Sequence, residues 1–138
     1  MKVVNQLTSI KIPAKPEYIG LARLLTAAYA GLLGFDNEAI EDIKIAVSEA
    51  CTNAMLQLHK EAHADKNMVE VDSYFEPDRL FIDIKYMTRE ASPVEKLRAQ
   101  LSERDLGMSI LTSIMDKVEI MKTKDWQMVL RLIKKIPD

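Results

Sequence analysis

Apolar side chains recur at helical spacing in two stretches of the first sixty residues. Residues 18–32 place apolar side chains one turn apart, and Gly34 follows as a natural helix stop. A second helical pattern begins after Asp36, which is a good N-cap residue, and holds to about Leu58. The chain is therefore predicted to form two consecutive helices near its beginning.

Alternating apolar and polar positions predict short strands on both sides of these helices. Residues 68–75 and 80–87 alternate and are joined by Glu76-Pro77-Asp78-Arg79, which is a good turn, so they predict a hairpin. Further strands are predicted at 7–12, around 118–120 and over 126–132, with a helix over 107–115. The charged residues 93–104 are predicted as a short exposed helix or a mobile segment.

Strands grouped in hairpins favour an antiparallel or mixed sheet covered by helices. The predicted fold class is α+β, a two-layer α/β sandwich with a mixed, mostly antiparallel sheet and helices on one face. No linker, repeat or low-complexity tract interrupts the chain, so residues 1–138 are expected to form a single domain.

Composition narrows the class of protein. A formal net charge of −2 gives no electrostatic reason to expect nucleic acid as a partner. The longest uncharged apolar stretch, 24–35, is too short to cross a bilayer, which needs about 20 residues, so no membrane association is expected. A single cysteine, Cys51, fits a reducing compartment. We therefore expect a cytoplasmic protein.

Candidate chemistry gathers in the second predicted helix. Glu49 and Asn53 are four residues apart and share one helical face. A carboxylate can polarise a hydroxyl group, and an amide oxygen can contribute to a Mg²⁺ site. The alternative interpretation is a solvated helix face that carries a polar pair.

Two other features have structural explanations. His59 and His63 have a spacing that suits a metal, but a histidine near a helix end also suits the helix dipole, which we favour. Cys51 lies beside the apolar stripe without an evident base, so we interpret it as a buried structural thiol.

The chain resembles the anti-sigma-factor serine kinases of the GHKL ATPase superfamily. The resemblance rests on the segments 12–18 and 40–53, and on Leu106-Gly107-Met108 opening a helix that is followed by 115–119. It implies a Bergerat-type ATPase fold that uses ATP and Mg²⁺. It also implies Glu49 as the general base, Asn53 as a Mg²⁺ and cofactor ligand, and Leu106, Gly107 and Met108 at the nucleotide. The implied partners are a sigma factor and a STAS-type anti-anti-sigma protein, and the chain is expected to pair as a homodimer.

The sequence departs from that family at the nucleotide. Where the family has an Asp-x-Gly box after the second hairpin strand, alignment by the strand places Tyr86 and Thr88. A phenol is a poorer acceptor than a carboxylate, and threonine resists the positive φ that glycine allows. Of four glycines, Gly107 alone remains for a phosphate loop, and the lid segment 89–104 has none. We therefore expect a degenerate nucleotide site, with ATP and Mg²⁺ bound weakly or no cofactor at all.

These observations favour a regulator that binds a sigma factor or its antagonist and has weakened or lost ATP binding. One alternative is an active ATP-dependent serine kinase that phosphorylates an anti-anti-sigma factor. A second alternative is a non-catalytic scaffold domain that keeps only the fold. The enzyme assignment stays open at this point because phosphoryl transfer needs a positioned nucleotide as well as a base.

Overall fold

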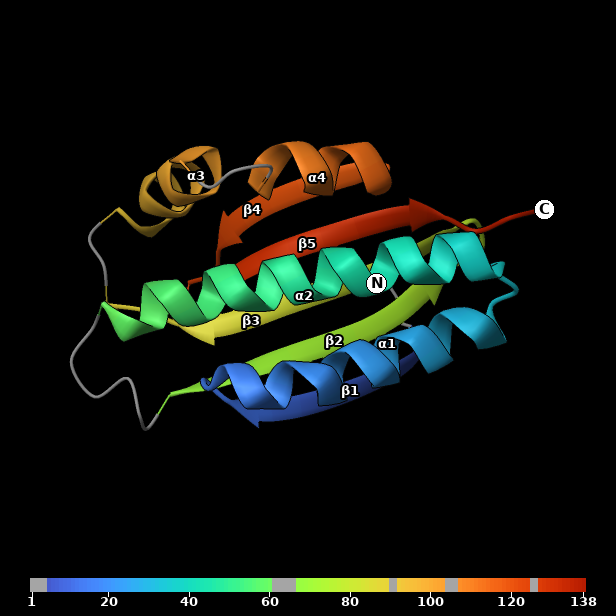
Figure 1. Ribbon diagram of the computed structural model, residues 1–138, viewed down its shortest axis with the longest axis horizontal. Helices are drawn as coiled ribbons and strands as arrows, with labels where there is room; N and C mark the ends of the chain where they lie inside the picture. Colours follow the sequence, from blue (N-terminus) through green and yellow to red (C-terminus); the bar gives the residue numbers. More distant parts are fainter. Residues whose placement is uncertain (1–4, 61–66, 90–91, 104–106, 125–126) are drawn as a thin grey trace.

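The computed structural model describes residues 5–60, 67–89, 92–103, 107–124 and 127–138 (Figure 1). Each sequence pattern above has a counterpart among these elements. They are β1 (Asn5–Pro13), the short 3₁₀ turn η1 (Pro16–Tyr18), α1 (Ile19–Leu32), α2 (Asn37–His59), β2 (Met68–Glu76), β3 (Arg79–Met87), α3 (Pro93–Glu103), α4 (Gly107–Ile114), β4 (Lys117–Lys122) and β5 (Gln127–Lys135).

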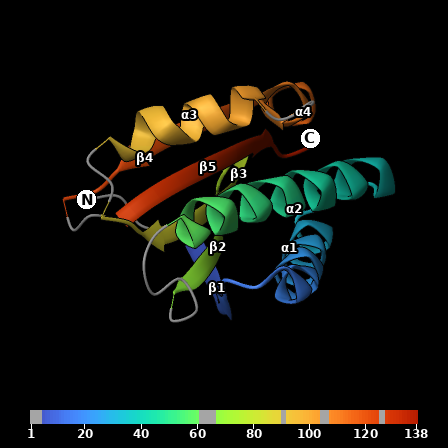
Figure 2. The ribbon, with the colours of Figure 1, turned by 60° about the vertical axis from the view of Figure 1, so that its left-hand side comes forward.

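The five strands form one sheet in the order β1-β2-β3-β5-β4. Every pairing between these strands is antiparallel, so the sheet is wholly antiparallel over the described residues rather than mixed. All of the α-helices lie on the same side of the sheet, with α1 over β1 and β2 and with α3 and α4 beside β4 (Figures 1 and 2). The predicted α+β sandwich with helices on one face is confirmed.

Strand alternation creates the core between the sheet and the helices. Ile82 of β3 is paired with Leu132 of β5 on one side and with Ser73 of β2 on the other. Ile82, Ile84 and Leu132 are fully buried and belong to one apolar cluster with residues of α1 and α2. The period of two seen in the sequence therefore separates a helix-covered face from an opposite face.

Local signals place the helix ends. The Asp36 carboxylate accepts a hydrogen bond from the Ala39 backbone N–H at 2.8 Å, which caps the first turn of α2. Gly34 has φ +90°, so the link between α1 and α2 uses a backbone conformation that side-chain-bearing residues rarely adopt. Both sequence signals act as predicted.

The segment predicted as exposed or mobile is a packed helix instead. Leu97 and Leu101 of α3 have no exposed surface and belong to the main apolar cluster, and Val94 packs partly buried against it. Their spacing of three and four residues follows one face of a helix. The charged residues of the segment lie on the opposite face, which made the whole segment look exposed.

Within the described residues, the helices fall short of the length and apolarity that crossing a membrane requires.

Candidate functional site

Helix α2 brings the two predicted site residues into direct contact. The Asn53 side-chain amide donates hydrogen bonds to the Glu49 carboxylate at 3.0 Å and to the Glu49 backbone carbonyl at 2.8 Å. Asn53 has no exposed surface, whereas Glu49 is half-buried. The spacing therefore places both side chains on one face, and the roles assigned to them by resemblance stay predictions.

The carbonyl end of the same amide is bonded to helix α3. The Gln100 side-chain amide donates to Asn53 Oδ1 at 2.8 Å and to the Asn53 backbone carbonyl at 3.0 Å. Asn53 thus uses its N–H₂ group toward Glu49 and its oxygen toward Gln100. Helix α3 reaches the residue to which the family resemblance gives the metal.

Two further side chains hold the other end of Gln100. Gln57 donates to Gln100 Oε1 at 2.6 Å, and Lys60 donates to the same oxygen at 3.3 Å. Gln57 lies one turn beyond Asn53, so Glu49, Asn53 and Gln57 form a polar row along α2. Sequence reasoning missed Gln57 and Gln100. The four-residue spacing from Asn53 indicates that Gln57 shares its helix face. The position of Gln100 between Leu97 and Leu101 indicates that it lies next to the apolar stripe of its helix.

The two residues that align with the family's Asp-x-Gly box are both buried. Tyr86 lies in the family's adenine-reading position by sequence, and here it is buried in the same cluster as Leu97 and Leu101. Burying a leucine side chain stabilises a fold by about 1.5–3 kcal/mol, so the two leucines give α3 substantial anchoring. Thr88 is buried, and Gln6 is the one non-glycine residue with positive φ among those described. The chain therefore avoids the backbone conformation for which the family uses glycine here.

The second glycine box is only partly described. Gly107 is buried and is the first residue of α4, as predicted, while Met108 is half-buried and packs against the core. Leu106 lies outside the described residues. The nucleotide role proposed for these three residues by resemblance stays a prediction.

The residues at this site do not fit a Mg²⁺–nucleotide complex in the conformation that the structure describes. A Mg²⁺ ligand must touch the ion directly, at 2.0–2.1 Å. Asn53 has no exposed surface, and its oxygen already accepts a hydrogen bond from Gln100. Gln100 of α3 therefore lies where the ion would have to approach this oxygen.

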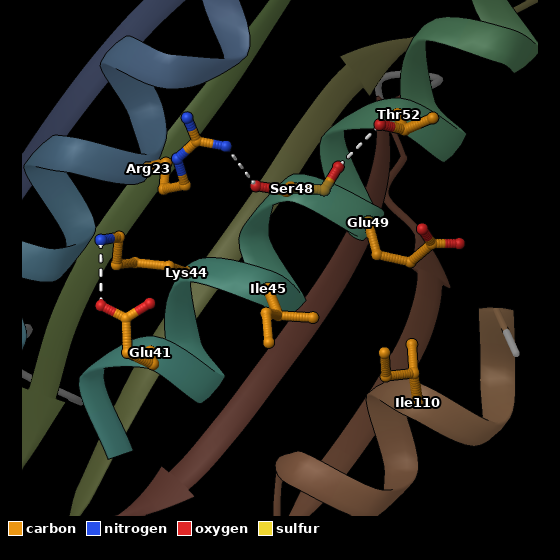
Figure 3. Close-up of a pocket in the computed structure, with 8 residues that line it drawn as sticks. All are labelled: Arg23, Glu41, Lys44, Ile45, Ser48, Glu49, Thr52 and Ile110. Carbon is orange, nitrogen blue, oxygen red and sulfur yellow. Dashed lines mark hydrogen bonds and ion pairs between the residues drawn. The ribbon is translucent and has the colours of Figure 1, made fainter. Parts of the chain in front are cut away.

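A groove of about 520 Å³ opens along α2 on the other side of Glu49 (Figure 3). Glu49 extends toward α4, where Ile110 lies across the groove, and Arg23 reaches over from α1 to donate to Ser48 Oγ at 3.3 Å. The groove is lined by residues of three helices: Arg23, Glu41, Lys44, Ile45, Ser48, Glu49, Thr52 and Ile110. It offers two cations, two carboxylates and exposed apolar surface at Ile45 within one concave surface.

His59 and Cys51, which the sequence analysis interpreted as structural residues, are each in contact with or buried by the rest of the fold. The ring nitrogen Nε2 of His59 lies 2.9 Å from the Ala14 carbonyl, and His63 lies outside the described residues. No cluster of three or more potential metal ligands occurs among the described residues. Cys51 has no exposed surface, and burial raises the pKa of its thiol to about 12. A thiol this well protonated is a structural group, as predicted.

Comparison with known proteins agrees with this geometry. Residues 12–134 match the family model described as the histidine kinase-like ATPase domain. Among curated proteins, serine-protein kinase RsbW of Bacillus pumilus is 38% identical over 131 residues, which cover 87% of this chain and 81% of the relative. The same-named proteins of Bacillus licheniformis and Bacillus subtilis are 40% and 37% identical, again over 87% of this chain and 81% of the relative.

These matches run through the segments on which the resemblance was based, and they confirm it. The polar row on α2 and the strands β2, β3 and β4 lie inside the matched region, which also covers β5 up to residue 134. The chain belongs to the histidine kinase-like ATPase domain family and, within it, to the group of the RsbW serine-protein kinases.

Proposed function

We propose that this protein is an anti-sigma-factor regulator that acts by binding protein partners and whose ATP binding is weakened. One contrast carries the proposal. The groove beside Glu49 is open to a partner, while the side chain of Asn53 has no exposed surface and is bonded to Gln100 of helix α3. Partner binding needs only the open surface, whereas phosphoryl transfer also needs a positioned nucleotide.

The groove has the chemistry of a protein-binding surface. Ile45 of α2 lines the groove and is 44% exposed, so it gives apolar contact area among the charged residues. Arg23 and Lys44 are part-buried, so a partner that covers them removes only the water that still contacts their side chains. Arginine beside apolar side chains is a frequent composition at the centre of interfaces. The proposed partners are an alternative sigma factor and a STAS-type anti-anti-sigma protein.

Binding of purified partners tests this proposal. The wild type is expected to bind the host's alternative sigma factor or its STAS-domain antagonist in a calorimetric titration. Arg23→Ala is expected to weaken that binding by tenfold or more, because a central interface arginine contributes above about 1.4 kcal/mol. Arg23 has only one long hydrogen bond to Ser48 in the described residues, so its loss should leave the fold intact.

Leu32→Ala is the matched control on the same helix, since Leu32 is 85% exposed and lies outside the groove. It should bind both partners as the wild type does. Binding of neither partner by the wild type contradicts the proposal. Equal binding by Arg23→Ala and the wild type places the partner surface elsewhere.

An active serine kinase is the second candidate function. Two observations favour it: Glu49 extends into the open groove, where a partner's hydroxyl group can reach it, and the curated relatives are named serine-protein kinases. Transfer of labelled phosphate from ATP to the STAS-domain protein, abolished by Glu49→Gln, would support this candidate. The absence of ATP binding at millimolar nucleotide with Mg²⁺ would exclude it.

We also propose that the protein works in the cytoplasm as a homodimer. The support is the family to which the chain belongs, since sigma factors and their antagonists act in the cytoplasm. Light scattering should give twice the chain mass of 15.7 kDa. A monomer at micromolar concentration contradicts the dimer and leaves the partner binding to be judged by the titrations above.

A further inference from the structure

The contact between Gln100 and Asn53 has a consequence for nucleotide binding. Asn53 Oδ1 is the atom that would have to reach a Mg²⁺ ion, and Gln100 occupies it. We propose that α3 is a plug of the nucleotide site, so that α3 docked through Gln100 and a bound Mg²⁺–nucleotide complex exclude each other. The proposal rests on the family's nucleotide site and concerns how this chain controls access to it.

The Asn53 side-chain amide cannot contact Gln100 and a Mg²⁺ ion at the same time. Its N–H₂ group is bonded to Glu49 at 3.0 Å and its oxygen to Gln100 at 2.8 Å. The oxygen has a second lone pair, but the side chain has no surface that a solvated ion can approach. Because Mg²⁺ usually keeps several of its waters, it needs space around its protein ligand as well as a free lone pair. Gln100 must therefore leave before the ion can bind.

Gln100 cannot leave by itself. Leu97 and Leu101 precede and follow it on the same helix, and both are fully buried in the core cluster. Rotating the Gln100 side chain alone would leave α3 docked through these leucines, and Asn53 has no exposed surface while α3 is docked. The opening motion is therefore a displacement of α3 as a unit.

The polar contacts show that Gln100 is matched to this position. Its N–H₂ group has two acceptors, both on Asn53, and its oxygen has two donors, Gln57 and Lys60. A side-chain amide can be both donor and acceptor in this way, whereas a carboxylate offers acceptors only. A substitution at position 100 can therefore remove the donors to Asn53 and keep the acceptor of Gln57 and Lys60.

Gln100→Glu is that substitution. Glutamate keeps the shape of glutamine and still accepts from Gln57 and Lys60, but it faces the two Asn53 carbonyl oxygens with negative charge instead of N–H donors. Gln100→Ala removes both halves of the contact. Arg98→Ala is the matched control, because Arg98 is exposed on the outer face of α3.

Calorimetric titration of each protein with ATP and excess Mg²⁺ measures the effect of the plug. A ligand that binds only the open form has its apparent affinity reduced by the fraction of protein that is open. We expect Gln100→Glu and Gln100→Ala to bind Mg²⁺–ATP about tenfold more tightly than the wild type and Arg98→Ala. Hydrogen exchange should in addition show the α3 amides between Leu97 and Leu101 losing protection when Mg²⁺–ATP is added to saturation.

Three results would overturn the proposal. The first is equal ATP affinity in all four proteins, and the second is unchanged α3 protection at saturating Mg²⁺–ATP. The third is undetectable ATP binding by both Gln100 variants at millimolar nucleotide while thermal unfolding shows them folded, since α3 would then not be the barrier. The partner titrations with Arg23→Ala use no nucleotide, so failure of the plug and failure of the proposed function give separate results.

Discussion

Arg131 and Asp83 form a two-point ion pair across the sheet face that points away from the helices. Arg131 Nε lies 2.8 Å from Asp83 Oδ1, and Arg131 Nη2 lies 3.0 Å from Asp83 Oδ2. The two residues are direct partners in the β3–β5 register, while Asp72 is the direct partner of Asp83 on β2. Arg131 therefore compensates one of two carboxylates that face each other across neighbouring strands.

Replacing Arg131 by methionine should destabilise the protein strongly. Asp83 is 5% exposed. Without the guanidinium, its carboxylate would lose its cationic partner and would still accept a hydrogen bond from the neutral Tyr74 hydroxyl at 3.0 Å. Breaking a buried ion pair from one side leaves an uncompensated charge, so the free energy of unfolding should fall by about 2–4 kcal/mol. Urea denaturation at pH 7 measures this loss.

The double variant Asp83→Asn/Arg131→Met separates charge from packing. It removes the buried charge together with its partner, and it should recover more than half of the stability that Arg131→Met loses. Arg131 also lies over the Phe81 ring at 5.9 Å. Equal losses in the single and double variants would assign the effect to that packing instead.

Asn53→Ala should lower the stability of the resting fold. The substitution removes one of the two acceptors of the buried Gln100 amide and leaves a small cavity beside Glu49. An unsatisfied buried donor costs about 1–3 kcal/mol, and the free energy of unfolding should fall by that amount in urea denaturation. Leu56→Ala on the same helix is the control, because Leu56 is 39% exposed and should cost less. A loss in Asn53→Ala no larger than that of the control would show that the polar row does not stabilise α2 against α3.

The sequence was sufficient for features that rest on neighbouring residues. Asp36 and Gly34 mark helix ends through local hydrogen bonding and backbone conformation, and the Glu49–Asn53 pair follows from helical spacing alone. These features were predicted because each interaction spans at most four residues. The hairpin of β2 and β3 was predicted from its turn for the same reason.

Features that rest on distant residues were missed. Gln100 meets Asn53 and Gln57 across 47 and 43 residues, and no local pattern reports such a contact. The burial of α3 was missed because Leu97 and Leu101 stand among charged residues, which dominate the composition of that segment. The contact of α3 with the polar row on α2 is therefore a tertiary property that local sequence patterns do not reveal.

Two glycines near the end of α1 should respond differently to substitution by alanine. At Gly34 an added Cβ meets nothing within 4 Å, so the cost of Gly34→Ala comes from φ +90° alone and should be about 1–2 kcal/mol. Gly31 lies inside α1, where alanine is favoured over glycine by about 1 kcal/mol, and the new Cβ would touch Ile40 at an ordinary 3.9 Å. Thermal unfolding should show a lower Tm for Gly34→Ala and an unchanged or higher Tm for Gly31→Ala. A lower Tm for Gly31→Ala would mean that the added Cβ disturbs the packing against Ile40 by more than the gain in helix propensity.

Cys51 makes the stability of the protein sensitive to alkaline pH. Burial raises the pKa of its thiol from 9.0 to about 12, so the folded chain keeps a proton that the unfolded chain releases. The resulting stabilisation is fully present below about pH 9 and is lost as the pH rises from 9 toward 12. Cys51→Ala removes this contribution while leaving every other titrating group in place. In urea denaturation the stability advantage of the wild type over Cys51→Ala should shrink by about 1–2 kcal/mol between pH 8 and pH 10.5, since one pKa unit corresponds to 1.36 kcal/mol. A difference between the two proteins that stays constant over this range would mean that the Cys51 thiol ionises as readily in the folded chain as in the unfolded one.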